Sequence, residues 1–296
     1  MADANGVFGY RSRTPRDNHT AAMQALPQRH GQHILRNRRL GELIGRRPAG
    51  TTANQWNSAL RTRFDFAVCA AGDGAPVFAV EFAAPADGGQ VRARRMADAV
   101  CAAAGLPLLR VETEAPLVAR GQQIVEYLVD ARAFAAATAP AGGYDDELPE
   151  PVVGFREIVG RLPDGRQGFV NDLGILARLA MMEAYVAGQV ADPIVRGLHL
   201  FWGDGSAEGW AWAELGGGRC LFERVRLGGT GLACGVPLDR FAEDLAVVAV
   251  GDRLRALEAG QEGVRVRSDV ARLFRSLRER GSEIRDVARL AHIQFD

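Results

Sequence analysis

The sequence of 296 residues contains no lysine, so all 36 of its basic side chains are arginines. A guanidinium group keeps its proton at any working pH, which makes arginine a poor general base. Any mechanism that needs a catalytic lysine is therefore excluded. Arginine can still stabilise the negative charge of a phosphate group.

The sequence also lacks long apolar runs and paired cysteine motifs. No apolar run reaches about 18 residues, the length of a membrane-spanning helix, so we expect no membrane association. The polar residues 1–28 lack the apolar core of a secretory signal, which favours a cytoplasmic protein. The four cysteines form no C-x-x-C pair, so we expect buried thiols in a reducing compartment rather than a zinc site.

Charge is unevenly distributed, although the formal net charge is zero. Residues 1–110 contain 15 arginines and 8 acidic residues, whereas residues 111–150 contain 2 arginines and 8 acidic residues. A basic segment of this kind favours binding to polyanions such as nucleic acids. The alternative interpretation is that these arginines lie on ordinary solvated faces.

The length and the composition predict two domains. We expect a flexible basic arm at residues 1–28, a first domain at 29–138 and a linker at 139–151, which is rich in proline, glycine and acidic residues. Residues 152–296 would then form a second domain of the α+β class, with an unknown role. The expected fold class is α/β, with a small mixed sheet flanked by helices in the first domain.

Residues 63–112 have the pattern of a β-β-α-β unit. Alternating apolar residues predict a strand over 64–68, and a turn at 71–76 leads to a second strand over 77–82. A helix is predicted over 90–104, followed by a buried strand over 106–111.

Further elements are predicted on both sides of the linker. Helices are expected over 117–137, 172–187, 238–257, 268–280 and from 282 to 292, and strands over 210–215 and 220–227. In the helix over 172–187, the apolar face is predicted to comprise Leu173, Leu176, Leu179, Ala180 and Val186. The segment Gly228–Gly231 is predicted to be a turn, because it lacks the lysine of a phosphate-binding loop.

Two carboxylates fall on the strands of the predicted hairpin. Asp65 lies in the first strand and Glu81 ends the second. Opposed side chains on one face of a hairpin lie a few ångströms apart, so the two carboxylates could share a divalent cation. Such a metal ion can activate water and stabilise a phosphoryl transition state. In the alternative interpretation, Asp65 forms an ion pair with an arginine and Glu81 faces water.

Four sequence segments carry a resemblance to a known group of proteins. They read HILRNRRLGELI at 33–44, RFDFAV at 63–68, AVEF at 79–82 and AGLPLLRV at 104–111. In this order and spacing they resemble an uncharacterised bacterial domain family of the PD-(D/E)XK nuclease-like superfamily, related to very-short-patch repair endonucleases. The resemblance covers about residues 33–112 and implies a nuclease-like fold.

The resemblance also implies a site, which this sequence retains only in part. Asp65 and Glu81 occupy the two metal-binding and catalytic carboxylate positions, where Mg²⁺ would bind if the site were active. Ala83 stands where the superfamily has its lysine, and the acid and the histidine common in related proteins are absent. Asp87 or Asp98 could replace a lost ligand, whereas Arg110 is expected to pair with one of the acids.

Arginines near this site are the candidates for contacts to substrate or nucleic acid. Arg94 and Arg95 could support catalysis electrostatically. The predicted nucleic-acid contacts are Arg36, Arg38, Arg39, Arg92, Arg94 and Arg95.

Three functions follow from these observations. The first is a catalytically degenerate nuclease-fold module that binds DNA, RNA or a protein partner. The second is an active Mg²⁺-dependent endonuclease that uses Asp65 and Glu81. The third is a structural or scaffold protein that acts through a partner bound by residues 152–296.

Overall fold

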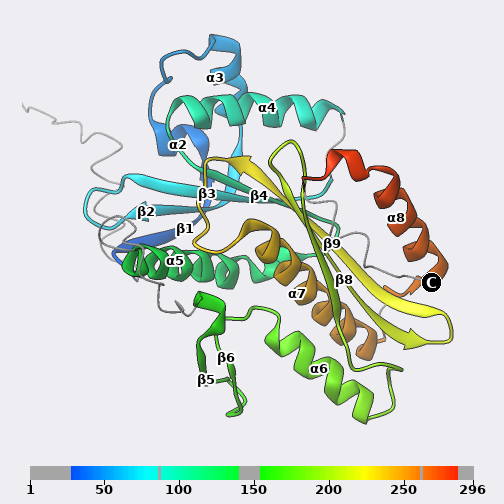
Figure 1. The fold of residues 1–296 in the computed structure, drawn as a ribbon. Coiled ribbons are helices and arrows are strands. Elements are labelled where there is room, and N and C mark those ends of the chain that lie inside the picture. Colours follow the sequence, from blue (N-terminus) through cyan, green and yellow to red (C-terminus); the bar gives the residue numbers. More distant parts are fainter. Residues whose placement is uncertain (1–27, 86–87, 140–153, 261–262, 286–296) are drawn as a thin grey trace, which may run out of the picture.

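A computed structural model describes residues 28–85, 88–139, 154–260 and 263–285 (Figure 1). The strands are β1 (Gln32–Arg39), β2 (Arg63–Ala70), β3 (Pro76–Ala83), β4 (Leu108–Thr113), β5 (Val159–Arg161), β6 (Gln167–Phe169), β7 (Arg196–Phe201), β8 (Ala207–Gly216), β9 (Arg219–Thr230) and β10 (Arg265–Val266). The α-helices are α2 (Leu40–Ile44), α3 (Ala53–Ala59), α4 (Gly88–Ala103), α5 (Gly121–Thr138), α6 (Ile175–Val186), α7 (Leu238–Glu258) and α8 (Arg267–Glu279). Short 3₁₀ helices, η1 to η3, span Leu117–Arg120, Phe155–Glu157 and Gly281–Glu283.

Eight of the strands form one mixed sheet with the order β1-β2-β3-β4-β9-β8-β7, and β10 pairs with β9. Within the described residues, β3 and β4 are the one parallel pair in this sheet, and α4 connects them. Parallel neighbours need a crossover of this kind, whereas antiparallel neighbours can be joined by tight turns. The predicted α/β class, with a mixed sheet flanked by helices, is confirmed.

The sheet continues from the first predicted domain into the second. β4 pairs with β9 in an antiparallel register that runs from Leu108 opposite Thr230 to Thr113 opposite Val225. Both halves of the chain therefore contribute strands to one hydrogen-bonded sheet. The predicted arm at 1–28 lies outside the described residues except for residue 28, and the predicted linker at 139–151 except for residue 139.

Helices cover both faces of the sheet (Figure 1). α5 and α7 pack on one face and share the largest apolar cluster with β2, β3, β4, β8 and β9. On the other face, α2, α3 and α4 cover β2, β3 and β4, whereas α8 covers β7, β8 and β9. The middle of this second face, over β4 and β9, lies between α4 and α8.

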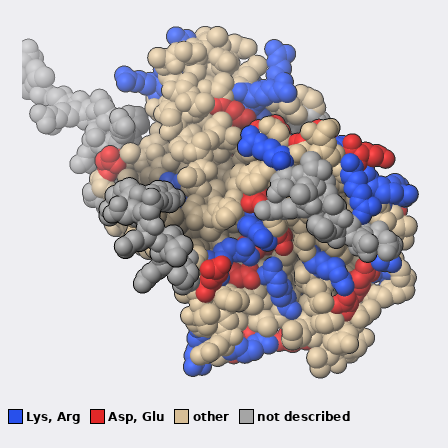
Figure 2. Space-filling view, viewed as in Figure 1, with Lys and Arg blue, Asp and Glu red and all other residues tan. Residues whose placement is uncertain are grey.

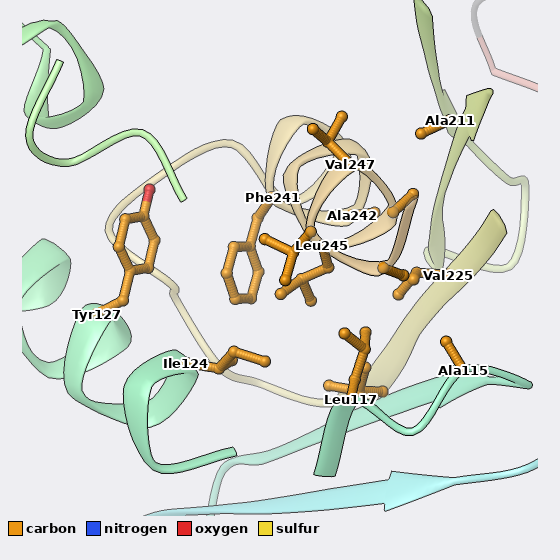
Figure 3. Packing of buried hydrophobic residues seen from close by; sticks show 14 of the residues in the cluster. Ala115, Leu117, Ile124, Tyr127, Ala211, Val225, Phe241, Ala242, Leu245 and Val247 are labelled. Carbon is orange, nitrogen blue, oxygen red and sulfur yellow. The ribbon is translucent and has the colours of Figure 1, made fainter. Parts of the chain in front are cut away.

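α7 is the central helix of the core. Figure 3 shows Phe241 and Leu245 of α7 directed toward Ile124 of α5, with Val225 of β9 on the other side. Each buried side chain of this size contributes about 1.5–3 kcal/mol to stability. Gly209 of β8 allows the close contact with α7, because a Cβ atom there would lie 2.1 Å from the backbone of α7.

A buried polar cluster lies beside α7. Asp244 of α7 is fully buried and accepts a hydrogen bond of 2.7 Å from Nη2 of Arg156. Its second oxygen, Oδ2, and the hydroxyl of Tyr127 have no hydrogen-bond partner among the described atoms. Burial, together with the nearby Asp172 carboxylate, raises the pKa of Asp244 to about 7, although the charge of Arg156 acts in the opposite direction.

Most predicted elements are confirmed. The hairpin, the helix and the strand of the β-β-α-β unit correspond to β2, β3, α4 and β4, and the later predictions correspond to α5, α6, β8, β9, α7 and α8. All four cysteines are buried and unpaired, as expected. Strands β5, β6, β7 and β10 and helix α3 were not predicted, and most of the predicted helix from 282 to 292 lies outside the described residues. Among the described residues, no helix combines the length and the apolar character needed to cross a bilayer.

The prediction of a turn at Gly228–Gly231 was wrong for its first three residues. Gly228, Gly229 and Thr230 end strand β9 and pair with β4. Gly229 has a φ of +127°, and a Cβ atom there would lie 1.9 Å from the carbonyl oxygen of Leu108. Glycine is thus required at this position by the close approach of two strands, rather than by a turn.

The predicted apolar face of α6 was wrong in part, because Leu173 and Ala180 pack against the core but Leu176 and Val186 are exposed. The residues that face the core are Ala177, Met181 and Ala184. Of the predicted face, Leu176 is 39 % exposed and Val186 is 82 % exposed. The prediction failed because α6 has apolar residues on two sides, and the larger ones lie on the side away from the core.

Candidate functional site

Asp65 and Glu81 lie on adjacent antiparallel strands, because β2 and β3 pair with Phe66 opposite Val80. Asp65 is half-buried, and its Oδ2 accepts a hydrogen bond of 2.7 Å from the backbone N–H of Phe82. This bond ties the end of β3 to β2. Glu81 makes a different contact, with a residue of β4.

Glu81 belongs to a buried ion network centred on Arg110. The guanidinium of Arg110 donates from Nε to Glu81 Oε2 at 2.9 Å and from Nη2 to Asp98 Oδ1 at 2.9 Å. A second bond of 3.2 Å joins Nη1 to Asp98 Oδ2, so Asp98 of α4 is held by two parallel hydrogen bonds. The predicted pairing of Arg110 with one of the acids is confirmed for Glu81.

The network fixes the charge of Arg110 despite its burial, with only 7 % of the residue exposed. Burial alone would lower the pKa of Arg110, but the hydrogen bonds and charges of Asp98 and Glu81 outweigh it and raise that pKa. A permanent positive charge therefore lies beside the carboxylate that the resemblance assigns to Mg²⁺. A divalent cation at Glu81 would have to displace or approach this guanidinium, which electrostatic repulsion opposes.

Other acids do not complete a metal site in the described part of the chain, where no group of three or more His, Cys, Asp or Glu side chains is arranged to hold a metal ion. Asp98, one suggested replacement ligand, is held by Arg110. Asp87, the other, lies outside the described residues. Glu81 and Asp98 are thus both engaged by Arg110, whereas Asp65 is bound by the backbone N–H of Phe82.

The three predicted arginines of α4 differ in their availability. Arg94 donates to Glu112 Oε1 at 2.6 Å and to the carbonyl oxygen of Ala84 at 3.0 Å, so its charge is neutralised inside the protein. Arg92 and Arg95 are exposed. Of these three candidates for nucleic-acid contacts, only the exposed pair projects into solvent.

The edge of the sheet carries a second group of arginines. Arg36, Arg38 and Arg39 lie on the edge strand β1, and Arg39 faces Arg63 of β2 in the strand register. Arg63 Nη1 donates to Asn37 Oδ1 at 3.0 Å. In the described part of the chain, neither Arg39 nor Arg63 forms an ion pair with a carboxylate.

The flanking arginines on β1 have weak partners. Arg36 donates to the Gln122 side chain at 3.2 Å and lies over the ring of Phe66. Arg38 approaches Glu42 at 4.0 Å, the outer limit for an ion pair. We define Arg36, Arg38, Arg39 and Arg63 as the edge arginine group. Because like charges directly opposite each other in a sheet are unfavourable, an anion bound between Arg39 and Arg63 would stabilise this arrangement.

A charged groove crosses the second face of the sheet between α4 and α8. It consists of two neighbouring hollows of about 410 and 620 Å³, both lined by Glu112 of β4 and Arg226 of β9. Arg226 donates to Asp204 at 2.7 Å, and Arg265 donates to Glu114 at 3.0 Å. Figure 2 shows blue and red side chains interleaved over the middle of the molecule, while blue side chains project at its upper edge, where α3 and α4 lie.

Sequence reasoning did not identify Arg63 or the groove. The register that places Arg63 opposite Arg39 depends on the pairing of β1 with β2, and the groove depends on the pairing of β4 with β9. The sequence of β9 could have indicated the groove. Arg224 and Arg226 are two residues apart in this strand, so their side chains lie on one face of the sheet.

A comparison with protein families matches residues 24–129 of the chain. No curated protein and no solved structure matches the chain. The matched segment begins before β1 and ends within α5, so it contains Glu81, Arg110 and the edge arginine group, but not β8, β9 or α8. Residues 24–129 are similar to the family described as "Protein of unknown function (DUF2726)".

Proposed function

We propose that the segment from β1 to α5 is a nuclease-like module that binds nucleic acid through its phosphates and does not cleave it. The order of its elements supports this proposal. An antiparallel β1-β2-β3 unit is followed by α4 and by β4 parallel to β3. This is the order of strands and helix that the resemblance to PD-(D/E)XK nuclease-like proteins implies.

The Glu81–Arg110 contact supports the proposal that the module does not cleave nucleic acid. The guanidinium already supplies the positive charge that Glu81 would otherwise take from a metal ion. The chain has no lysine, and among the described residues no third free acid lies beside Glu81. A group that activates water is therefore lacking among the candidate residues.

The edge arginine group supports the proposal that the module binds the phosphates of a nucleic acid. Its four guanidiniums lie on two neighbouring strands, and Arg39 and Arg63 have no carboxylate partner within the described residues. Arginine binds phosphate oxygens with two parallel hydrogen bonds, which suits a sugar–phosphate backbone. The charged groove is less suited to a polyanion, because its arginines are paired with acids.

Binding can be tested by fluorescence anisotropy with labelled duplex DNA, single-stranded DNA and single-stranded RNA over a range of salt concentrations. Each phosphate contact contributes about −0.9 to the slope of log K against log salt for duplex DNA. The double variant Arg39→Ala/Arg63→Ala should weaken binding and reduce the magnitude of that slope by about 2. Arg272→Ala, which removes an exposed arginine from α8, is the matched control and should leave both quantities unchanged.

The same preparations test cleavage. We expect no cleavage of plasmid DNA in Mg²⁺ or Mn²⁺. Metal-dependent cleavage that disappears in Glu81→Ala would favour the active endonuclease, in which Asp65 and Glu81 bind the metal ion. Equal binding by the wild type and the double variant would refute the assignment of the edge arginine group.

A cytoplasmic location is part of this proposal. The four buried cysteines are free thiols, which suits a reducing compartment. Nucleic acids are also accessible there.

A further inference from the structure

Exposed apolar side chains are concentrated in one stretch of the chain, outside the proposed nucleic-acid module. This stretch contains the β5–β6 hairpin, α6 and the residues that lead to β7. We define its exposed large apolar residues as the α6 surface: Val159, Phe169, Val170, Leu176, Met182, Tyr185, Val186 and Ile194. Their exposed fractions range from 39 % to 82 %.

α6 itself has two apolar sides. The side against the core has small residues and one methionine, and the opposite side has larger residues. The outer stripe is Ile175, Leu179, Met182 and Val186. Their spacing of four, three and four residues is the a/d spacing of helices that pack against another helix. The first two residues are half-buried and the last two are exposed, so the stripe opens toward its C-terminal end.

The hairpin lies beside α6. Nη2 of Arg166, next to β6, donates to Glu183 Oε1 of α6 at 3.0 Å. Figure 1 shows the hairpin and α6 together at the end of the molecule away from α3 and α4. The apolar residues of the two elements are therefore part of one region.

We propose that the α6 surface binds the same surface of a second copy of this chain, with the two α6 helices antiparallel. A two-fold interface requires a surface that is complementary to itself. The spacings of four, three and four residues are the same in both chain directions. An antiparallel partner helix therefore places Ile175 opposite Val186 and Leu179 opposite Met182. The two-fold axis then passes between Ala180 and Met181.

Charge and area both favour a second copy as the occupant. The charged residues of α6 are paired locally, because Arg178 donates to Asp172 at 2.6 Å and Glu183 accepts from Arg166, so identical surfaces meet without repulsion. The exposed fractions leave on the order of 700 Å² of surface on these eight residues, against roughly 800 Å² per partner in a standard interface. A typical monomer has a largest apolar patch of only about 300–600 Å².

Sedimentation velocity over a range of concentrations tests the proposal. The wild type should be a dimer at micromolar concentration, and Val186→Glu should weaken dimerisation by about 100-fold, because the variant places a carboxylate in both copies of the apolar seam. Val266→Glu is the matched control, since Val266 is 54 % exposed but lies on β10 beside β9. A monomeric wild type, or a dimer that persists unchanged in Val186→Glu, would overturn the proposal.

Disulfide formation tests the antiparallel arrangement directly. The double variant Ile175→Cys/Val186→Cys should form a disulfide-linked dimer on oxidation. In the antiparallel arrangement, the cysteine at position 175 of one copy faces the cysteine at position 186 of the other copy. The two positions are eleven residues apart on one helix, about 16 Å, too far for a disulfide within one chain. Val186→Cys alone should not cross-link, and its cross-linking would contradict the antiparallel pairing. The four natural cysteines are buried and should not interfere.

Dimerisation through the α6 surface does not depend on the proposed nucleic-acid binding. Val186→Glu leaves the edge arginine group unchanged, and Arg39→Ala/Arg63→Ala leaves the α6 surface unchanged. Failure of either test therefore does not affect the other.

Discussion

Replacing Asp244 with asparagine should stabilise the protein at alkaline pH. The carboxyl group is fully buried, and only one of its oxygens has a hydrogen-bond partner among the described atoms. Its pKa is raised from 3.8 to about 7, mainly by burial. Between these two pH values the folded protein therefore holds a proton that the unfolded chain has released.

The sign and the size of the effect follow from proton linkage. Because the folded state binds more protons between pH 3.8 and pH 7, the free energy of unfolding decreases as pH rises through this window. A shift of about three pKa units corresponds to roughly 4 kcal/mol, at about 1.4 kcal/mol per unit. Asp244→Asn removes the ionisation and retains the shape, so it should match the wild type near pH 4 and exceed its stability by up to about 4 kcal/mol at pH 8.

Urea denaturation of both proteins at several pH values between 4 and 8 measures this difference. Other titrating groups are common to both proteins and cancel when the two free energies of unfolding are subtracted. Arg156→Met provides a second check, because removing the guanidinium should move the midpoint of the pH dependence upward. A variant less stable than the wild type at pH 8 would mean that Arg156 stabilises the ionised Asp244 by more than burial destabilises it, and would refute the reasoning.

Two other predictions concern β9 and the thiols. Gly229→Ala should lower the free energy of unfolding by about 3 kcal/mol or more, since its Cβ atom would meet the carbonyl oxygen of Leu108 at 1.9 Å. Gly228→Ala is the control. Because the space around its Cβ position is open, this variant should lower the free energy of unfolding by less than about 1 kcal/mol. Comparable losses in the two variants by urea denaturation would contradict this account. The native protein should not react with a thiol reagent at pH 8, because burial raises the four cysteine pKa values to about 11 or 12. After unfolding, all four thiols should react. A fast-reacting thiol in the native state would show that one of these sites opens readily.

Local patterns in the sequence predicted the elements around the candidate site well. Alternation over Phe64–Val68, the turn after Ala70 and the helix before Gly105 depend on residues close together in the chain. The sequence analysis also predicted that Arg110 pairs with one of the acids, but it did not identify Glu81 as the partner. That choice depends on the pairing of β3 with β4, which lie on either side of α4 in the chain.

The remaining features depend on contacts that no local pattern contains. α6 has two apolar sides, and its periodicity alone does not indicate which side faces the core; the close packing of α7 selects the side with small residues, such as Ala177. Gly229 was predicted to lie in a turn. Glycine is favoured both in turns and where two strands approach closely, so the residue alone does not distinguish these two cases. The pairing of Arg39 with Arg63 required the register of β1 and β2.

The position of β4 in the middle of the sheet affects how the protein is made in the cell. β4 needs β9 as its antiparallel neighbour, yet β9 is synthesised more than 100 residues later. At about 5–20 residues per second, the nascent chain exposes the free edge of β4 for roughly 5–20 seconds. An unpaired strand edge is a template for pairing with other chains, so this interval is the period in which the nascent chain most needs a chaperone.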